Sequence, residues 1–151
     1  MVADYDGDGL ADPAVYNRVT GLWAISLSGS SGQVITGTFG SSAYLPVSAD
    51  YDGDGLADPA IYAPATADWQ VLPSTSLTAA LAVQGRYATL WDGVVGNVNG
   101  LPVPADYDGD GQADPAVYHQ GTGLWQLFRS SQSYRERNGY FGGPEYQLVL
   151  E

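Results

Sequence analysis

Hydrophobic and polar residues alternate in short stretches of this chain, and turn-forming residues separate the stretches. Between Leu22 and Leu27, tryptophan, isoleucine and leucine at odd positions alternate with leucine, alanine and serine at even positions. A period of two is expected of a β-strand. Residues 124–129 are the counterpart of this stretch later in the chain. Glycine and proline are abundant and no long amphipathic helical pattern occurs, so the pattern predicts an all-β, turn-rich protein.

These stretches recur in three units of similar sequence. Each unit opens on a nine-residue stretch, Asp-Tyr-Asp-Gly-Asp-Gly-x-Ala-Asp, at residues 4–12, 50–58 and 106–114. At fixed distances after each opening come a proline, a tyrosine and a tryptophan: Pro13, Tyr16 and Trp23; Pro59, Tyr62 and Trp69; Pro115, Tyr118 and Trp125. Such self-similarity is the signature of a repeat architecture. The second unit is longer by about ten residues, which we place between Ser74 and Asp92.

Four short strands are predicted in each unit. The first precedes the Asp-rich loop (residues 45–47 and 101–103), and the second is the Pro-Ala-Val/Ile-Tyr stretch directly after it. The third is residues 22–27 or 124–129, and the fourth is about 33–39 or 134–141. Four strands in such a unit match one blade of a β-propeller. The sequence therefore predicts a single module over 1–151 with three four-stranded blades per chain, in units of about 1–46, 47–102 and 103–151.

Residues 146–149 correspond to residues 44–47, which lead into a loop, whereas the chain starts at Met1-Val2-Ala3 just before its first loop. The C-terminal stretch thus supplies the strand that the first unit lacks. Known propellers have about four to eight blades, so three are too few for a ring. We expect two chains to join head to tail into a six-bladed ring. The alternative is that the sequence is a piece of a longer array.

The net charge of −12 comes from the three loops. They hold twelve of the seventeen acidic residues, and the other five equal the five arginines in number. Because no basic patch exists, a nucleic-acid partner is not expected. No apolar run is long enough for membrane insertion. No signal peptide precedes the first loop, and cysteine is absent.

The loops have the composition of a calcium site. Carboxylates stand at loop positions 1, 3, 5 and 9, with glycines at 4 and 6 that permit a tight backbone turn. Position 7 varies, as expected if it contributes only a backbone carbonyl. Oxygen ligands at flexible distances suit Ca²⁺ better than Mg²⁺. An EF-hand is excluded, because position 12 is Val15, Ile61 or Val117 where that motif needs an acid, and a strand follows where it needs a helix.

The loop, the Pro-Ala-Val-Tyr stretch after it and the Phe-Gly at 39–40 and 141–142 together resemble the FG-GAP/VCBS repeat family. That resemblance covers nearly the whole chain. It implies the blades of a calcium-bearing propeller like that of integrin α-subunits, with three Ca²⁺ per chain. By match to the motif, the ligands are Asp4, Asp6, Asp8, Leu10 and Asp12; Asp50, Asp52, Asp54, Leu56 and Asp58; Asp106, Asp108, Asp110, Gln112 and Asp114. Leu10, Leu56 and Gln112 contribute their backbone carbonyls.

No catalytic arrangement is recognised. His119 is the sole histidine, and no serine or acid is placed with it as a nucleophilic site requires. We therefore expect a non-enzymatic module in extracellular or cell-surface recognition, of a bacterial secreted kind, with a protein or glycan partner. One alternative is a lectin that stacks sugars on Trp23, Trp69 and Trp125, which otherwise pack between blades. Another is a non-catalytic segment of a larger secreted enzyme or toxin.

Overall fold

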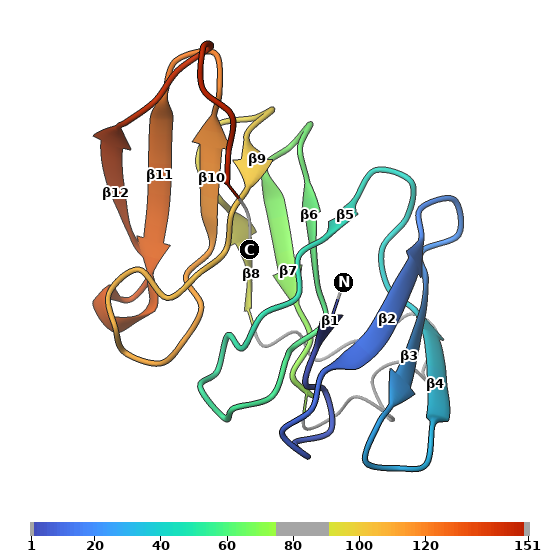
Figure 1. Cartoon of the computed structure of the whole chain (residues 1–151). Helices are drawn as coiled ribbons and strands as arrows, with labels where there is room; N and C mark the ends of the chain where they lie inside the picture. Colours follow the sequence, from blue (N-terminus) through green and yellow to red (C-terminus); the bar gives the residue numbers. More distant parts are fainter. Residues whose placement is uncertain (1, 75–90, 150–151) are drawn as a thin grey trace.

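The computed structural model describes residues 2–74 and 91–149, and these form an all-β protein (Figure 1). In these described ranges, twelve strands make three separate antiparallel sheets of four strands, and none of the three sheets closes on itself. A short 3₁₀ turn, η2 (Ser130–Gln132), is the only named helix in the described ranges. No helix in this part of the chain is long and apolar enough to cross a membrane. Most of the extra stretch of the second unit, residues 75–90, lies outside the described residues.

Each sheet follows the predicted order of strands. The first sheet contains β1 (Val2–Ala3), β2 (Asp12–Asn17), β3 (Leu22–Leu27) and β4 (Gln33–Thr38). The second contains β5 (Leu45–Pro46), β6 (Ala60–Ala63), β7 (Asp68–Val71) and β8 (Trp91–Val94). The third contains β9 (Leu101–Pro102), β10 (Ala116–His119), β11 (Leu124–Arg129) and β12 (Arg135–Tyr140). The predicted bounds of β3 and β11 are confirmed. Seven other strands differ from prediction by a residue or two at their ends (β2, β4, β5, β6, β9, β10 and β12), and no bounds were predicted for β1, β7 and β8.

The sheets stand side by side in chain order, from the first (blue) to the third (orange) in Figure 1. Two hydrophobic clusters join them. One places Trp23, Ile25 and Phe39 of the first unit against Ile61 and Leu72 of the second. The other joins Tyr51, Trp69 and Val95 of the second unit to Ala113, Val117 and Phe128 of the third. The first and second sheets therefore each pack one face on the sheet that follows.

The third sheet has no following sheet in the chain, and its open face is covered only in part. Leu148 packs against Val103, Ala116 and Tyr118 there. Residues 146–149, which correspond to the β5 region, belong to no strand. The physical reason is visible in the second sheet, where β5 gains its hydrogen bonds from β6 of the unit that follows it. Among the described residues, no equivalent strand pairs with residues 146–149.

Candidate metal centres

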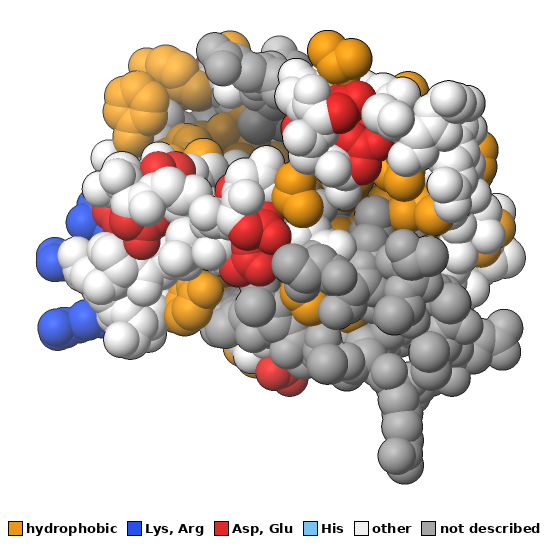
Figure 2. Space-filling model, turned by 90° about the horizontal axis from the view of Figure 1, so that it is seen from below, with side chains coloured by type: hydrophobic (Ala, Val, Ile, Leu, Met, Phe, Trp, Pro, Cys, Tyr) orange, Lys and Arg blue, Asp and Glu red, His pale blue; other side chains and the backbone are white. Residues whose placement is uncertain are grey.

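The three Asp-rich loops connect the first and second strands of each sheet, and they lie together at the lower end in Figure 1. Acidic side chains gather on this face of the molecule (Figure 2, red). Each loop brings three carboxylates together, with one oxygen of each within 4.8 Å of the others. The groups are Asp4, Asp6 and Asp8; Asp50, Asp52 and Asp58; Asp106, Asp108 and Asp114. The repeat thus produces three similar clusters of oxygen atoms.

The first aspartate of each loop shapes the turn. Asp4 accepts hydrogen bonds from the backbone N–H of Gly7 (2.6 Å) and Gly9 (3.0 Å). Asp50 and Asp106 accept the same pair of bonds in their loops. Gly7 has φ +81° and Gly9 has φ +82°, a left-handed backbone that favours glycine. The two glycines of the motif are therefore required by the turn that surrounds the carboxylates.

The last aspartate of each loop is fully buried and fixes the loop to the rest of its sheet. Asp58 accepts hydrogen bonds from the backbone N–H of Tyr51 (2.9 Å) and of Ser74 (2.6 Å). Asp12 and Asp114 make the equivalent bonds. The sequence predicts these residues only as metal ligands. In the structure, Asp58 and Asp114 belong to the carboxylate clusters and Asp12 does not, while all three hold the loop by backbone bonds.

Three serines complete the sites, and sequence reasoning did not identify them. Ser28, Ser74 and Ser130 each donate a hydroxyl hydrogen bond to the aspartate 20 residues earlier: Asp8 (2.9 Å), Asp54 (3.1 Å) and Asp110 (2.6 Å). The signal was present, because a serine recurs at the same place after every loop. These bonds bring the connection that follows the third strand onto the Asp-rich loop.

The electrostatics of the loops reflect both burial and hydrogen bonding. The pKa of Asp58 is raised to about 6, mainly by burial and in part by the charge on Asp52, although the Tyr51 and Ser74 N–H groups oppose the rise. The pKa of Asp52 is also raised, by burial and by its Asp54 and Asp50 neighbours. Burial alone would raise the pKa of Asp12, but bonds from the Ser28 and Tyr5 backbones bring it below its usual value. The second loop is therefore where negative charge is least favourable without a cation.

The third loop provides the clearest test of whether a cation fits. Asp108 Oδ2 accepts a hydrogen bond from Ser131 Oγ at 2.6 Å. Its Oδ1 is buried and has no hydrogen-bond partner in the part of the chain that the structure describes. A buried carboxylate oxygen without a partner is costly. Asp108 belongs to a cluster in which one oxygen of each carboxylate lies within 4.8 Å of the others. Such a spacing suits ligands placed at about 2.4 Å around one calcium ion. The residues present therefore fit Ca²⁺.

The repeated tryptophans lie in different environments. Trp23 and Trp69 are buried, so neither presents a ring face to a ligand, and only Trp125 is half-exposed. The indole N–H of Trp23 donates to the Phe39 carbonyl at 3.0 Å, and that of Trp125 donates to the Phe141 carbonyl at the same distance. Each tryptophan also packs beside the tyrosine opposite it on the neighbouring strand. Packing accounts for Trp23 and Trp69, which leaves Trp125 as the accessible one of the three.

His119 lies within hydrogen-bonding distance of the buried Gln126 side chain, 3.0 Å from Oε1. Gln126 also donates to Glu136 and accepts from the backbone N–H of Asn97. The histidine is therefore part of a local polar network that joins the second unit to the third sheet.

Comparison of the chain with protein-family models, with curated proteins and with solved structures gives no match. The functional interpretation therefore depends on the loops themselves and on their threefold repetition.

Replacing Ser130 with alanine is expected to lower the free energy of unfolding by about 1 kcal/mol, the usual value of one hydrogen bond. The Asp110 carboxylate loses its hydroxyl donor, while the backbone bond from Ser130 N–H to Asp114 is kept. Urea unfolding of the variant and the parent protein measures this difference. Ser42→Ala, at an exposed serine outside the three sites, serves as the control and should leave stability unchanged.

Proposed function

We propose that this protein is a non-enzymatic, calcium-binding β-propeller module of the FG-GAP/VCBS type. Its units of about 1–46, 47–102 and 103–151 are the blades. The observation that carries the proposal is the threefold recurrence of a carboxylate cluster at the same end of three similar sheets. The unpartnered buried oxygen of Asp108 supports a cation in such a cluster.

The role proposed for calcium is structural. Each loop places four carboxylates within nine residues, and their mutual repulsion opposes the turn. A divalent ion bound between them reverses the sign of that interaction. The last aspartate also accepts hydrogen bonds from the N–H of Tyr51 inside the loop and of Ser74 after the third strand. The ion would therefore fix the connection between the first two strands to the connection that follows the third.

Calcium stoichiometry tests this proposal directly. We expect isothermal titration of metal-free protein to give three Ca²⁺ per chain. Asp108→Ala removes one ligand from the third cluster and should reduce the number to two. Asp92→Ala is the matched control, because Asp92 is an exposed acid on β8 outside the loops. Absence of binding in the parent protein, or an equal loss in the Asp92 variant, would contradict the assignment.

The biological role that we propose is recognition outside the cell or at its surface. Glycan binding through Trp125 is the alternative, and it requires that the cavity of about 360 Å³ bordered by Tyr118, Trp125 and Phe141 stay open. A glycan array probed with and without EDTA separates the two roles. Signal that disappears in Trp125→Ala supports a lectin, and an empty array supports a protein partner.

A further inference from the structure

The two junctions between neighbouring sheets use the same backbone hydrogen bond. At the first junction, Ala57 N–H donates to the Asp4 carbonyl at 2.7 Å. At the second, Ala113 N–H donates to the Asp50 carbonyl at 2.6 Å. The equivalent donor in the first unit is Ala11, which is exposed, and the equivalent acceptor in the third unit is the carbonyl of Asp106. One half of a further junction is therefore present at each end of the row of sheets.

The side chains at the junctions repeat in the same way. Ile61 and Val117 are buried where their sheets meet the preceding sheet, with 1% and 0% of their surface exposed. Val15, the equivalent residue of the first sheet, is 69% exposed. On the opposite face, Phe39 and Val95 are buried. The equivalent Phe141 of the third sheet is 80% exposed.

The Asp-rich loops also meet at each junction. A Cβ placed on Gly7 would lie 2.8 Å from Leu56, and one placed on Gly53 would lie 3.1 Å from Gln112. The next loop in this series is that of the third unit, where a Cβ on Gly109 would meet nothing within 4 Å. At both junctions the glycine faces the position-7 residue of the next loop. At a further junction that residue would be Leu10 of a first loop, and the Leu10 side chain is 62% exposed.

We propose that a second copy of this chain binds head to tail, with its first sheet seated on the open face of the third sheet. We call these the head face (Leu10, Ala11 and Val15) and the tail face (Asp106, Gly109 and Phe141). The new junction would repeat the contacts of the two junctions within the chain, burying Val15 and Phe141 as Ile61 and Phe39 are buried. This inference rests on the proposed function for the ring architecture, and because both faces include residues of the Asp-rich loops, it is tested with calcium present.

The C-terminal segment adds a strand to this contact. Leu45 pairs with Tyr62 and Pro46 with Ile61. By the same register, Gln147 and Leu148 would pair with Tyr16 and Val15 of the second copy. A hollow of about 290 Å³ beside β2, bordered by Val15, Tyr16 and Trp23, lies where this segment would enter.

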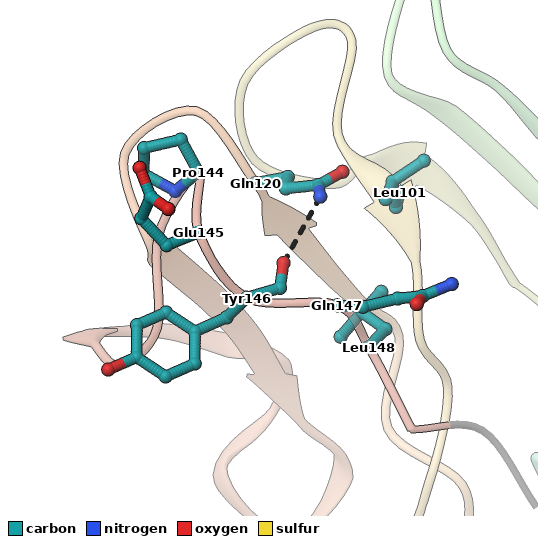
Figure 3. A pocket seen from close by; sticks show the side chains of 7 residues that line it. All are labelled: Leu101, Gln120, Pro144, Glu145, Tyr146, Gln147 and Leu148. Carbon is teal, nitrogen blue, oxygen red and sulfur yellow. Dashed lines mark hydrogen bonds between the residues drawn. The ribbon is translucent and has the colours of Figure 1, made fainter.

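In the single chain the same segment lies on the third sheet (Figure 3). There the Tyr146 carbonyl accepts a hydrogen bond from the Gln120 side chain at 3.1 Å, and the Tyr146 ring is exposed. The segment borders cavities on both sides, one of them about 500 Å³, so it fills its surroundings incompletely. Pairing with a second copy would give its backbone the hydrogen bonds that β5 and β9 make.

We expect the assembly to close with two copies. Heterologous contacts of this kind form either closed rings or open filaments, according to the rotation between units. Two chains contribute six sheets, which lies within the range of about four to eight blades in closed propellers. We therefore expect a closed pair with two equivalent junctions.

Light scattering coupled to size exclusion tests the proposal in calcium-containing buffer. The expected mass is twice the chain mass of 15.9 kDa. Val15→Asp in the head face and Phe141→Asp in the tail face should each halve it. The matched controls are Val19→Asp and Tyr140→Asp, which replace equally exposed residues outside the two faces. Tyr140 should stay exposed in the dimer, because its equivalent Val94 is exposed in the second sheet, which has a sheet on either side.

Mixing the two face variants makes the test specific for head-to-tail contact. Val15→Asp keeps an intact tail face and Phe141→Asp an intact head face, so an equimolar mixture should recover a dimer through one normal junction. Circular dichroism establishes that each variant is folded. A monomeric parent protein, or a dimer that both face variants retain, would overturn the proposal. Calcium stoichiometry is measured separately, so that failure here leaves the metal assignment standing.

Discussion

Removal of calcium is expected to lower the midpoint of thermal unfolding by roughly 20 °C, since a shift of 2–4 °C accompanies each kcal/mol in a chain of this size. A ligand that binds only the folded state stabilises it by about 2.7 kcal/mol per site at a hundredfold excess over Kd. Three sites per chain would therefore contribute about 8 kcal/mol together. That is comparable to the whole stability of an ordinary domain, about 5–15 kcal/mol.

Differential scanning calorimetry in excess calcium and in excess EDTA measures this effect. Adding calcium back should restore the original midpoint, whereas sodium chloride at equal ionic strength should restore little, because screening does not replace ligand bonds. Magnesium should be less effective than calcium, since it demands a stricter octahedral geometry. Equal midpoints in calcium and EDTA would refute a structural role for the ion.

The strands could be predicted where the sequence pattern was local. The alternation at Leu22–Leu27 and at Leu124–Arg129 gave strands with the observed bounds. Gly21 and Gly123, in the turn before each of these strands, have φ +72°, a conformation that favours glycine. The assignment of an all-β protein with four strands per unit follows from such local signals.

What the sequence did not reveal depends on contacts between distant segments. Serine is common in turns for several reasons, so the recurrence of Ser28, Ser74 and Ser130 marks these positions but does not show their hydrogen-bond partners until the fold places them beside the loops. The backbone bonds of Asp58 are another case. A carboxylate at loop position 9 fits a metal ligand equally well whether or not it also accepts N–H groups from Tyr51 and Ser74. Only the three-dimensional arrangement separates the two roles.

Replacing Asp58 with alanine is expected to lower the free energy of unfolding by about 3–5 kcal/mol even in EDTA, since hydrogen bonds to a charged acceptor contribute about 1.5–3 kcal/mol each. The variant leaves the Tyr51 and Ser74 N–H groups without their acceptor at a fully buried position. In calcium the loss should be larger, because a metal ligand is removed as well. Urea unfolding in each buffer gives both values.

Asp52→Ala is the control that separates the two contributions. Asp52 belongs to the same carboxylate cluster, but its one backbone bond in the described chain is a local one, from the Asp54 N–H at 3.1 Å. Its removal should cost stability in calcium and little or nothing in EDTA, where it also relieves repulsion from its neighbours. Asp58→Asn should fall between parent and alanine, because a neutral amide oxygen still accepts one of the two bonds. If Asp52→Ala and Asp58→Ala lost equal stability in EDTA, the buried aspartate would have no structural role beyond coordination.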